Sequence, residues 1–201
     1  VVRVAEEGPL WVRRARGAVP ESIVMPDVPG MDEASRPSVL AYGPWMKETL
    51  CQTRGGEAFL SQHIGDLENR TVVHAMKEGA EHLARILAKA PDAFACDAHP
   101  DFASTHEAER RAVESGLPLV KVPHHAAHVA AVAAEAGMTG RVLGLALDGV
   151  GLGPDGTPWG GELLALEPDH FTRLGHLAPL ALPGGDRAAR ECWRVGAALM
   201  D

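Results

Sequence analysis

Hydrophobic and polar residues recur with different periods along the chain, and each period predicts a type of element. Over residues 67–90 the apolar positions return every three or four residues, which is the period of a helix with one buried face. Elsewhere, short apolar runs between glycine and proline turns predict strands. Before residue 123 the expected strands span residues 39–42, 48–53, 58–62, 93–97 and 117–122. Two further helices are expected, one at 104–115 capped by Ser104 or Thr105, and one that begins after Pro123.

The order of these elements repeats. Three strands and a helix are followed by strand, helix, strand and helix, and after Gly140 the chain starts again with three strands. This second set is expected at residues 142–147, 161–166 and 171–177, and a helix follows over 187–200. Strands that alternate with helices are typical of a sheet covered by helices. We therefore expect an α/β fold of two similar lobes with a cleft between them, the second lobe being incomplete in this chain.

Composition divides the chain into four segments. Residues 1–20 resemble a hairpin with a basic run, and residues 21–37 are rich in proline with little periodicity, as in a linker. The first lobe is expected over 38–140 and the start of the second over 141–201. The chain begins without methionine and stops inside an expected helix, so we expect a longer polypeptide at both ends.

The composition also excludes several functions. The formal net charge is −8, and no basic stripe is present, which argues against a nucleic-acid partner. No apolar run reaches the length of a membrane span, and the first residues show no signal peptide. Cys51, Cys96 and Cys192 are odd in number and widely spaced, which favours reduced thiols. We expect a cytoplasmic protein without a membrane partner.

A pair of histidines begins the helix that follows Pro123. His124 and His128 are four residues apart, so they lie on the same face of a helix. Two imidazoles in this arrangement can share one transition-metal ion, and iron and zinc suit them alike. A solvated histidine patch would show the same spacing. His125 is turned about 100° from the shared face.

Glycine-rich turns follow the next expected strand, which ends at Asp148. The glycines are Gly149, Gly151, Gly160 and Gly161. A carboxylate at a strand end followed by glycines can present an acid to a metal or phosphate while the backbone comes close to the ligand. A plain hairpin turn is the alternative. Because His124 and Asp148 both follow strands, we expect them to form one site from opposite sides of the cleft.

Short motifs accompany these residues over nearly the whole chain. They are Ser-Gln-His-Ile-Gly-Asp-Leu-Glu-Asn from Ser61, Asp-Ala-His-Pro-Asp from Asp97, His-His-x-Ala-His from His124, Leu-Asp-Gly-x-Gly-x-Gly from Leu147, Trp-Gly-Gly-Glu from Trp159 and Leu-Pro-Gly-Gly-Asp from Leu182. In this order they resemble the HypF carbamoyltransferases of nickel–iron hydrogenase maturation. The basic run at 13–17 resembles the end of that family's YrdC-like domain. Residues from about 38 onward resemble its last domain, of the actin/sugar-kinase/Hsp70-like (ribonuclease H-like) class.

The resemblance implies a carbamoyl transfer that serves the synthesis of cyanide ligands for the hydrogenase iron. Carbamoyl phosphate and ATP would give carbamoyl adenylate in the YrdC-like domain. The domain in this chain would then pass the carbamoyl group to the C-terminal cysteine of a partner protein, HypE. The family's third metal ligand is an aspartate that would lie beyond Asp201, so we expect the isolated chain to be inactive.

The resemblance also implies roles for the candidate residues. A metal held by His124 and His128 would act as a Lewis acid on the carbonyl or phosphoryl oxygens of the adenylate. Asp148 would contact the metal through water or orient the nucleotide. His125 would support this group or carry a proton.

Further residues are implied for nucleotide binding. Lys47, in the turn between the first two strands of the first lobe, would pair with a phosphate as a point charge. The glycine turns, as far as Glu162, would present backbone N–H groups to the nucleotide.

Two other functions remain open. One is an O-carbamoyltransferase of natural-product tailoring, which uses a related domain with a sugar hydroxyl as the acceptor and the reverse domain order. The other is a nucleotide-binding or partner-docking module without turnover. The basic run that precedes the expected linker favours the HypF-like order.

Overall fold

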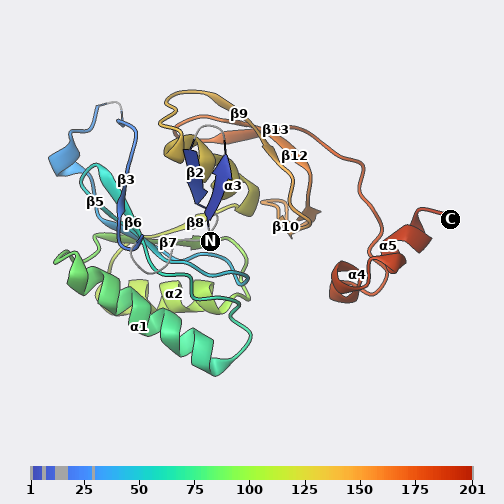
Figure 1. The fold of residues 1–201 in the computed structure, drawn as a ribbon, viewed down its shortest axis with the longest axis horizontal. Coiled ribbons are helices and arrows are strands. Elements are labelled where there is room, and N and C mark those ends of the chain that lie inside the picture. The colour runs from blue at the N-terminus through green and yellow to red at the C-terminus, as the bar shows by residue number, and fades with distance from the viewer. Residues whose placement is uncertain (1, 6–7, 12–17, 29, 201) are drawn as a thin grey trace.

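The computed structural model describes residues 2–5, 8–11, 18–28 and 30–200, and its largest sheet has six strands (Figure 1). The strands lie in the order β3-β6-β5-β4-β7-β8. Their bounds are Ser22–Val24 (β3), Val39–Ala41 (β4), Cys51–Arg54 (β5), Glu57–Leu60 (β6), Ala93–Asp97 (β7) and Leu119–Val122 (β8). β4, β7 and β8 run parallel, whereas β3, β5 and β6 pair antiparallel. The five strands expected before residue 123 are confirmed.

Helices lie on both sides of this sheet. α1 (Arg70–Ile86) and α2 (Ala103–Ser115) cover one face, and α3 (His124–Glu135) follows β8 on the other side (Figure 1). α1 begins where it does because the Asn69 side chain accepts the N–H groups of the first turn. The buried side chains that join α1 and α2 to the sheet include Leu40, Leu50, Phe59, Met76, Ala80, Leu83, Phe94 and Ala108. Their removal from water is the main force that holds this layer together.

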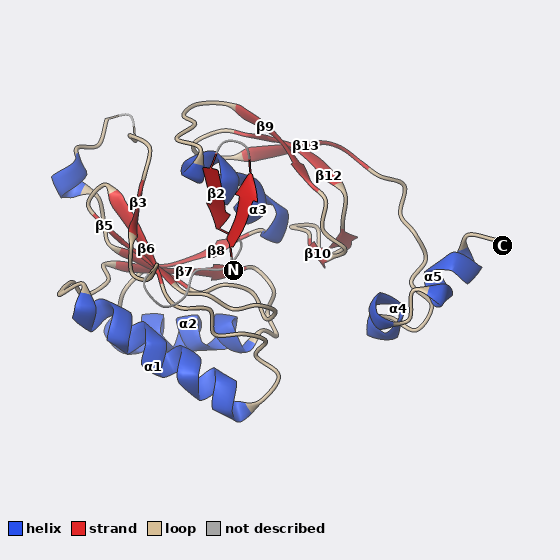
Figure 2. Cartoon of the chain, viewed as in Figure 1, coloured by secondary structure: helices blue, strands red, loops and turns tan. Residues whose placement is uncertain are grey.

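A second, antiparallel sheet packs on α3. It has the order β13-β12-β9, and a short ribbon of β10 and β11 lies beside it (Figure 2). The bounds are Val142–Ala146 (β9), Gly151–Leu152 (β10), Pro158–Trp159 (β11), Glu162–Leu166 (β12) and Phe171–His176 (β13). The residues of this second core are Val129, Ala133, Val142, Ala146, Trp159 and Leu164. The two expected sets of strands therefore form two separate sheets, with α3 packed on the second.

The expected cap of α2 is wrong. Ser104 and Thr105 lie inside the first turn, fully buried, and the Thr105 hydroxyl donates to the Asp97 carbonyl oxygen. The residue that precedes the helix is Phe102, whose side chain cannot cap it and stacks on the His99 ring at 4.1 Å between centroids. Tertiary packing, which the local sequence does not reveal, determines the residue at which α2 begins.

The helix expected over 187–200 is two short helices. α4 (Asp186–Arg190) and α5 (Trp193–Ala198) are separated at Glu191, whose backbone leaves the helical region with φ −112° and ψ 74°. The Glu191 carboxylate accepts the Nε–H of Arg194 at 2.6 Å. Both helices lie apart from the two sheets at the C-terminal end (Figure 2).

The segment 21–37 is not a free linker. Its first part is β3, which extends the six-stranded sheet by pairing with β6. Its second part contains a 3₁₀ turn (Glu33–Ser35), and the Glu33 carboxylate accepts the Gly56 N–H at 3.1 Å. β3 precedes the prolines of this segment, so their linker signal does not apply to Ser22–Val24.

The N-terminal hairpin is confirmed as β1 (Val2–Ala5) and β2 (Gly8–Trp11). The basic run at 13–17 lies outside the described residues, so the likeness of residues 1–20 to a YrdC-like domain stays a prediction. Among the helices that the structure describes, none is long and apolar enough to cross a membrane.

Candidate metal centre

His124, His128 and Asp148 come together at the start of α3. The Nε2 atoms of the two histidines face each other at 3.2 Å, as expected for the i and i+4 positions of one helix. Asp148, two residues beyond β9, places Oδ2 at 3.4 Å from His124 Nε2. One ligand atom from each of the three residues lies within 4.8 Å of the others. The sequence prediction that these residues form one site is therefore consistent with their positions.

The charges around the pair differ between the two histidines. His124 Nδ1 is bound to Asp97 Oδ2 at 2.7 Å, and this hydrogen bond raises the pKa of His124 against the opposing effect of burial. Burial lowers the pKa of His128, and the nearby His124 lowers it further. His128 is thus held in the neutral form that binds metals.

His125 is a buried neighbour of Asp148 on a different side of α3 from the histidine pair. Its ring is only 1% exposed, and its Nε2 lies 2.9 Å from Asp148 Oδ1. Within the described chain, neither ring nitrogen of His125 nor either oxygen of Asp148 has an aligned hydrogen-bond partner. His125 is turned away from the shared histidine face, as helix geometry requires, but it contacts the third member of the site.

The unpartnered oxygens of Asp148 test whether a metal ion fits, since His125 is not one of the three candidate ligands. Buried polar atoms in proteins almost always have a partner, and a group without one calls for an ion or water. Two imidazole nitrogens and a carboxylate are ligands that zinc and iron accept, and three protein ligands leave a position open for substrate. The residues present therefore fit a catalytic transition-metal site.

The glycine turns lie directly against this cluster. A Cβ at Gly151 would lie 2.5 Å from His124 Cδ2 and 2.8 Å from His125 Cε1, so only glycine leaves room for the two rings. A Cβ at Gly160 would meet the Gly149 carbonyl oxygen at 2.8 Å. Gly161 adopts φ +72°, the left-handed region that favours glycine. Close packing or backbone conformation requires glycine at positions 151, 160 and 161, whereas a Cβ at Gly149 would meet nothing within 4 Å. The contact of these turns with a nucleotide stays a prediction.

Glu162 is held by protein groups. Its fully buried carboxylate accepts Nε–H and Nη2–H of Arg173 at 2.6 and 2.8 Å and the Gly160 N–H at 3.0 Å. Burial raises the pKa of Glu162, but these hydrogen bonds outweigh it and keep the pKa below its usual range. Arg173 also stacks on Trp159 at 4.1 Å, and the Trp159 ring lies 6.0 Å from that of His125. Glu162 therefore fixes the Gly160 turn beneath the histidines, whether or not it also meets a nucleotide.

Lys47 lies outside the histidine cluster. It is exposed and adopts φ +56°, which is unfavourable for a residue with a side chain. Its N–H donates to Asp66 Oδ1 at 2.7 Å, and the next residue, Glu48, forms a bridge with Gly65. The motif that starts at Ser61 thus braces the turn that carries Lys47.

The sequence analysis did not predict the burial of Asp97 and Glu48, nor that of Glu107, which is 3% exposed and paired with Lys77 and Arg110. Asp97 ends β7, beside the strand that leads to His124, and this neighbourhood of parallel strand ends could have revealed it. Glu48 is completely buried, and burial raises its pKa to about 8. Nothing in its local sequence signals that burial.

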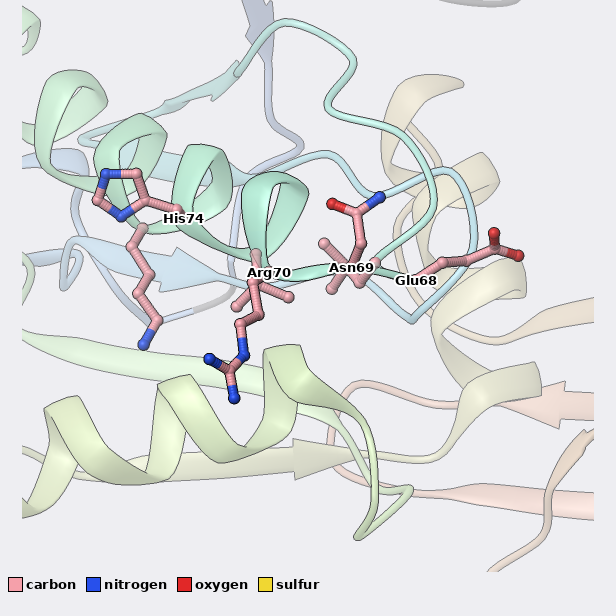
Figure 3. A pocket seen from close by; sticks show the side chains of 7 residues that line it. Glu68, Asn69, Arg70 and His74 are labelled. Carbon is pink, nitrogen blue, oxygen red and sulfur yellow. The ribbon is translucent and has the colours of Figure 1, made fainter.

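A pocket lies at the start of α1. Figure 3 shows Glu68 and Arg70 extending in different directions on either side of Asn69, with His74 further along the helix. None of the lining residues belongs to the histidine cluster. The pocket combines the opposite charges of Glu68 and Arg70, and the Asn69 side chain is already engaged in capping α1. Its lining therefore indicates no particular ligand.

The sequence and the fold match those of known proteins. Residues 34–135 match the family model described as the HypF Kae1-like domain, and residues 144–201 match the second subdomain of the carbamoyltransferase Kae1-like domain. The carbamoyltransferase HypF of Rhizobium leguminosarum bv. viciae is 50% identical over 200 residues, which is 100% of this chain and 25% of that protein.

Two solved structures have a similar overall fold. A crystal structure of full-length HypF in the phosphate- and nucleotide-bound form is 37% identical, with a TM-score of 0.81 over 91% of this chain and 23% of that one. The crystal structure of T. kodakarensis HypF is 35% identical, with a TM-score of 0.82 over 94% of this chain and 24% of that one.

Together, the two-sheet α/β fold with its histidine cluster and the matching family models define a Kae1-like carbamoyltransferase domain. The chain belongs to the HypF family. It spans about a quarter of the length of the curated relatives it matches.

Proposed function

We propose that this chain carries the site that transfers a carbamoyl group from carbamoyl adenylate to the C-terminal cysteine of the partner protein HypE, in nickel–iron hydrogenase maturation. The adenylate would come from carbamoyl phosphate and ATP. The observation that supports this most is the cluster of His124, His128 and Asp148, with buried acceptor atoms that lack a partner, in a chain of the HypF family.

The cluster would hold one zinc or iron ion through His124, His128 and Asp148. When bound, the ion supplies Lewis-acid stabilisation of a carbonyl or phosphoryl oxygen. His125, buried at 2.9 Å from Asp148 Oδ1, would keep that carboxylate in place. The acceptor thiolate attacks the carbamoyl carbon, the bond from that carbon to the adenylate oxygen breaks, and AMP leaves.

The remaining parts of the proposal concern the nucleotide and the compartment. Lys47 would contact a phosphate, and the Gly149–Gly161 turns would line the nucleotide. We place the reaction in the cytoplasm, which agrees with free thiols at Cys51, Cys96 and Cys192.

Single-turnover transfer tests the proposed function. The zinc-loaded full-length protein that contains this chain is mixed with carbamoyl adenylate and a peptide that ends in cysteine, and thiocarbamate is measured by mass spectrometry. We expect product with this peptide and none with a matched peptide that ends in serine. Product on a hydroxyl acceptor alone would favour an O-carbamoyltransferase, and adenylate binding without product on either acceptor would favour a binding module.

Replacing Lys47 by alanine should weaken the binding of ATP or carbamoyl adenylate by roughly 1.5–3 kcal/mol, the strength of a hydrogen bond to a charged group. Isothermal titration calorimetry of the variant and the parent would measure it. Arg70→Ala, which removes an exposed cation from the pocket in Figure 3, is the control and should bind as the parent does. Unchanged affinity in the Lys47 variant would mean that Lys47 is an ordinary solvated turn residue.

A further inference from the structure

Asp97 is a buried carboxylate at the edge of the metal centre. It is the last residue of β7 and pairs in register with Val122, the last residue of the parallel strand β8. The chain passes from Val122 through Pro123 into α3, so the end of β7 lies beside the first turn of that helix. The residue is 8% exposed, and its two oxygens have different partners.

Each oxygen accepts one hydrogen bond. Oδ1 accepts the backbone N–H of His99 at 2.8 Å, and Oδ2 lies 2.7 Å from His124 Nδ1. An ionised carboxylate can only accept hydrogen bonds. The proton of a neutral His124 ring must therefore be on Nδ1, which leaves the lone pair on Nε2.

Nε2 is the atom that faces the rest of the cluster. It lies 3.2 Å from His128 Nε2 and 3.4 Å from Asp148 Oδ2. A ring with its proton on Nε2 would direct a hydrogen, and no lone pair, at the metal position. Carboxylates that bind the far nitrogen of a metal-binding histidine fix both its tautomer and its orientation.

We propose that Asp97 is a positioning residue that selects the metal-binding tautomer of His124. This deepens the proposed function, because it rests on His124 as a metal ligand. A different role has to be distinguished from it: through Oδ1, Asp97 also fixes the loop that begins at His99, and that role is purely structural.

The substitution Asp97→Asn distinguishes the selection of the His124 tautomer from the structural role in the His99 loop. In Asp97→Asn the side-chain oxygen can keep the hydrogen bond from the His99 N–H, while the amide NH₂ takes the place of Oδ2. That NH₂ group donates to His124 Nδ1 and so places the ring proton on Nε2. The loop is preserved and the tautomer is reversed, as in the known effect of such a change beside a catalytic histidine.

The test combines zinc titration with nuclear magnetic resonance. We expect Asp97→Asn to bind Zn²⁺ about 10- to 100-fold more weakly than the parent. In the metal-free protein at alkaline pH, long-range ¹⁵N–¹H spectra should show the His124 proton on Nδ1 in the parent and on Nε2 in the variant. Asp101→Asn, the same substitution at an exposed position of the same loop, is the matched control and should change neither readout.

The outcomes are distinct. Equal zinc affinity in parent and Asp97→Asn, or a His124 proton on Nε2 in the parent, would overturn the proposal. The tautomer readout needs no metal, adenylate or acceptor, so it stands if the protein fails to transfer a carbamoyl group. Failure of transfer with the expected tautomers would count against the proposed function alone.

Discussion

In the full-length protein, replacing His124 or His128 by alanine should abolish the retention of metal, whereas His125→Ala should reduce it much less. The first two residues present their Nε2 atoms to the same point, 3.2 Å apart. His125 lies on another side of α3, with its Nε2 2.9 Å from Asp148 Oδ1, so its loss removes support from one ligand and no ligand itself. Removing either histidine deletes a direct ligand and leaves too few protein ligands to hold a transition metal through purification.

Elemental analysis of the purified variants would measure this. His74→Ala, on the exposed surface of α1, is a suitable control and should retain as much metal as the parent. Equal metal loss in the three variants of α3 would show that the shared helical face does not define the ligands. Metal retained by His128→Ala would instead remove that residue from the site.

Replacing Glu48 by glutamine should stabilise the protein at pH 8 and leave it unchanged near pH 4.5. Burial raises the pKa of Glu48 to about 8 from an ordinary value of 4.5, and the Gly43 N–H opposes this only in part. Between these two values the folded protein keeps a proton that the unfolded chain releases, so a rise in pH favours unfolding. Below 4.5 both states are protonated, and the group has no effect on stability.

The size of the effect follows from the shift. Each pKa unit corresponds to about 1.4 kcal/mol, so the loss between pH 4.5 and 8 is at most about 5 kcal/mol. Glutamine keeps the acceptor for the Gly43 N–H and carries no charge. Urea unfolding of Glu48→Gln and its parent at pH 5, 6.5 and 8 would measure the difference, with the exposed Glu68→Gln as control. Parallel stability curves for Glu48→Gln and the parent would show that this carboxyl is not proton-bound in the fold.

Local patterns predicted most of the fold because its elements follow strong periods. The strand over 93–97 is confirmed to the residue, and the histidine helix begins at His124 as expected. Errors arose where a distant contact decided the outcome. Ser104 has the composition of a helix cap, but packing buries it inside α2, and the period over 187–200 gives no sign of the break at Glu191.

In the candidate site, too, local patterns predicted some features and distant contacts decided the others. Spacing along one helix was enough to pair His124 with His128, and the order of strands was enough to add Asp148. Spacing could not show that Glu162 is bound by Arg173, because these residues are neighbours only through the pairing of β12 with β13. It also could not show the bond from Asp97 to His124, which joins residues 27 positions apart.

The close packing of α3 against β9 moves the boundary between the two structural units away from Gly140, where the repeat in the sequence places it. A Cβ at Gly144 would lie 2.3 Å from a methyl carbon of Val129, so the helix and the strand touch backbone to side chain with no space between them. The histidines of α3 and Asp148 beyond β9 therefore form one mechanical unit, although the repeat in the sequence separates them at Gly140. A piece that begins after that glycine would lack both histidines, and it would expose the apolar face of the second sheet on which Val129 and Ala133 of α3 pack. The boundary between the two packed units, the six-stranded sheet with α1 and α2 and the second sheet with α3, therefore lies at Pro123, where the chain passes from β8 into α3.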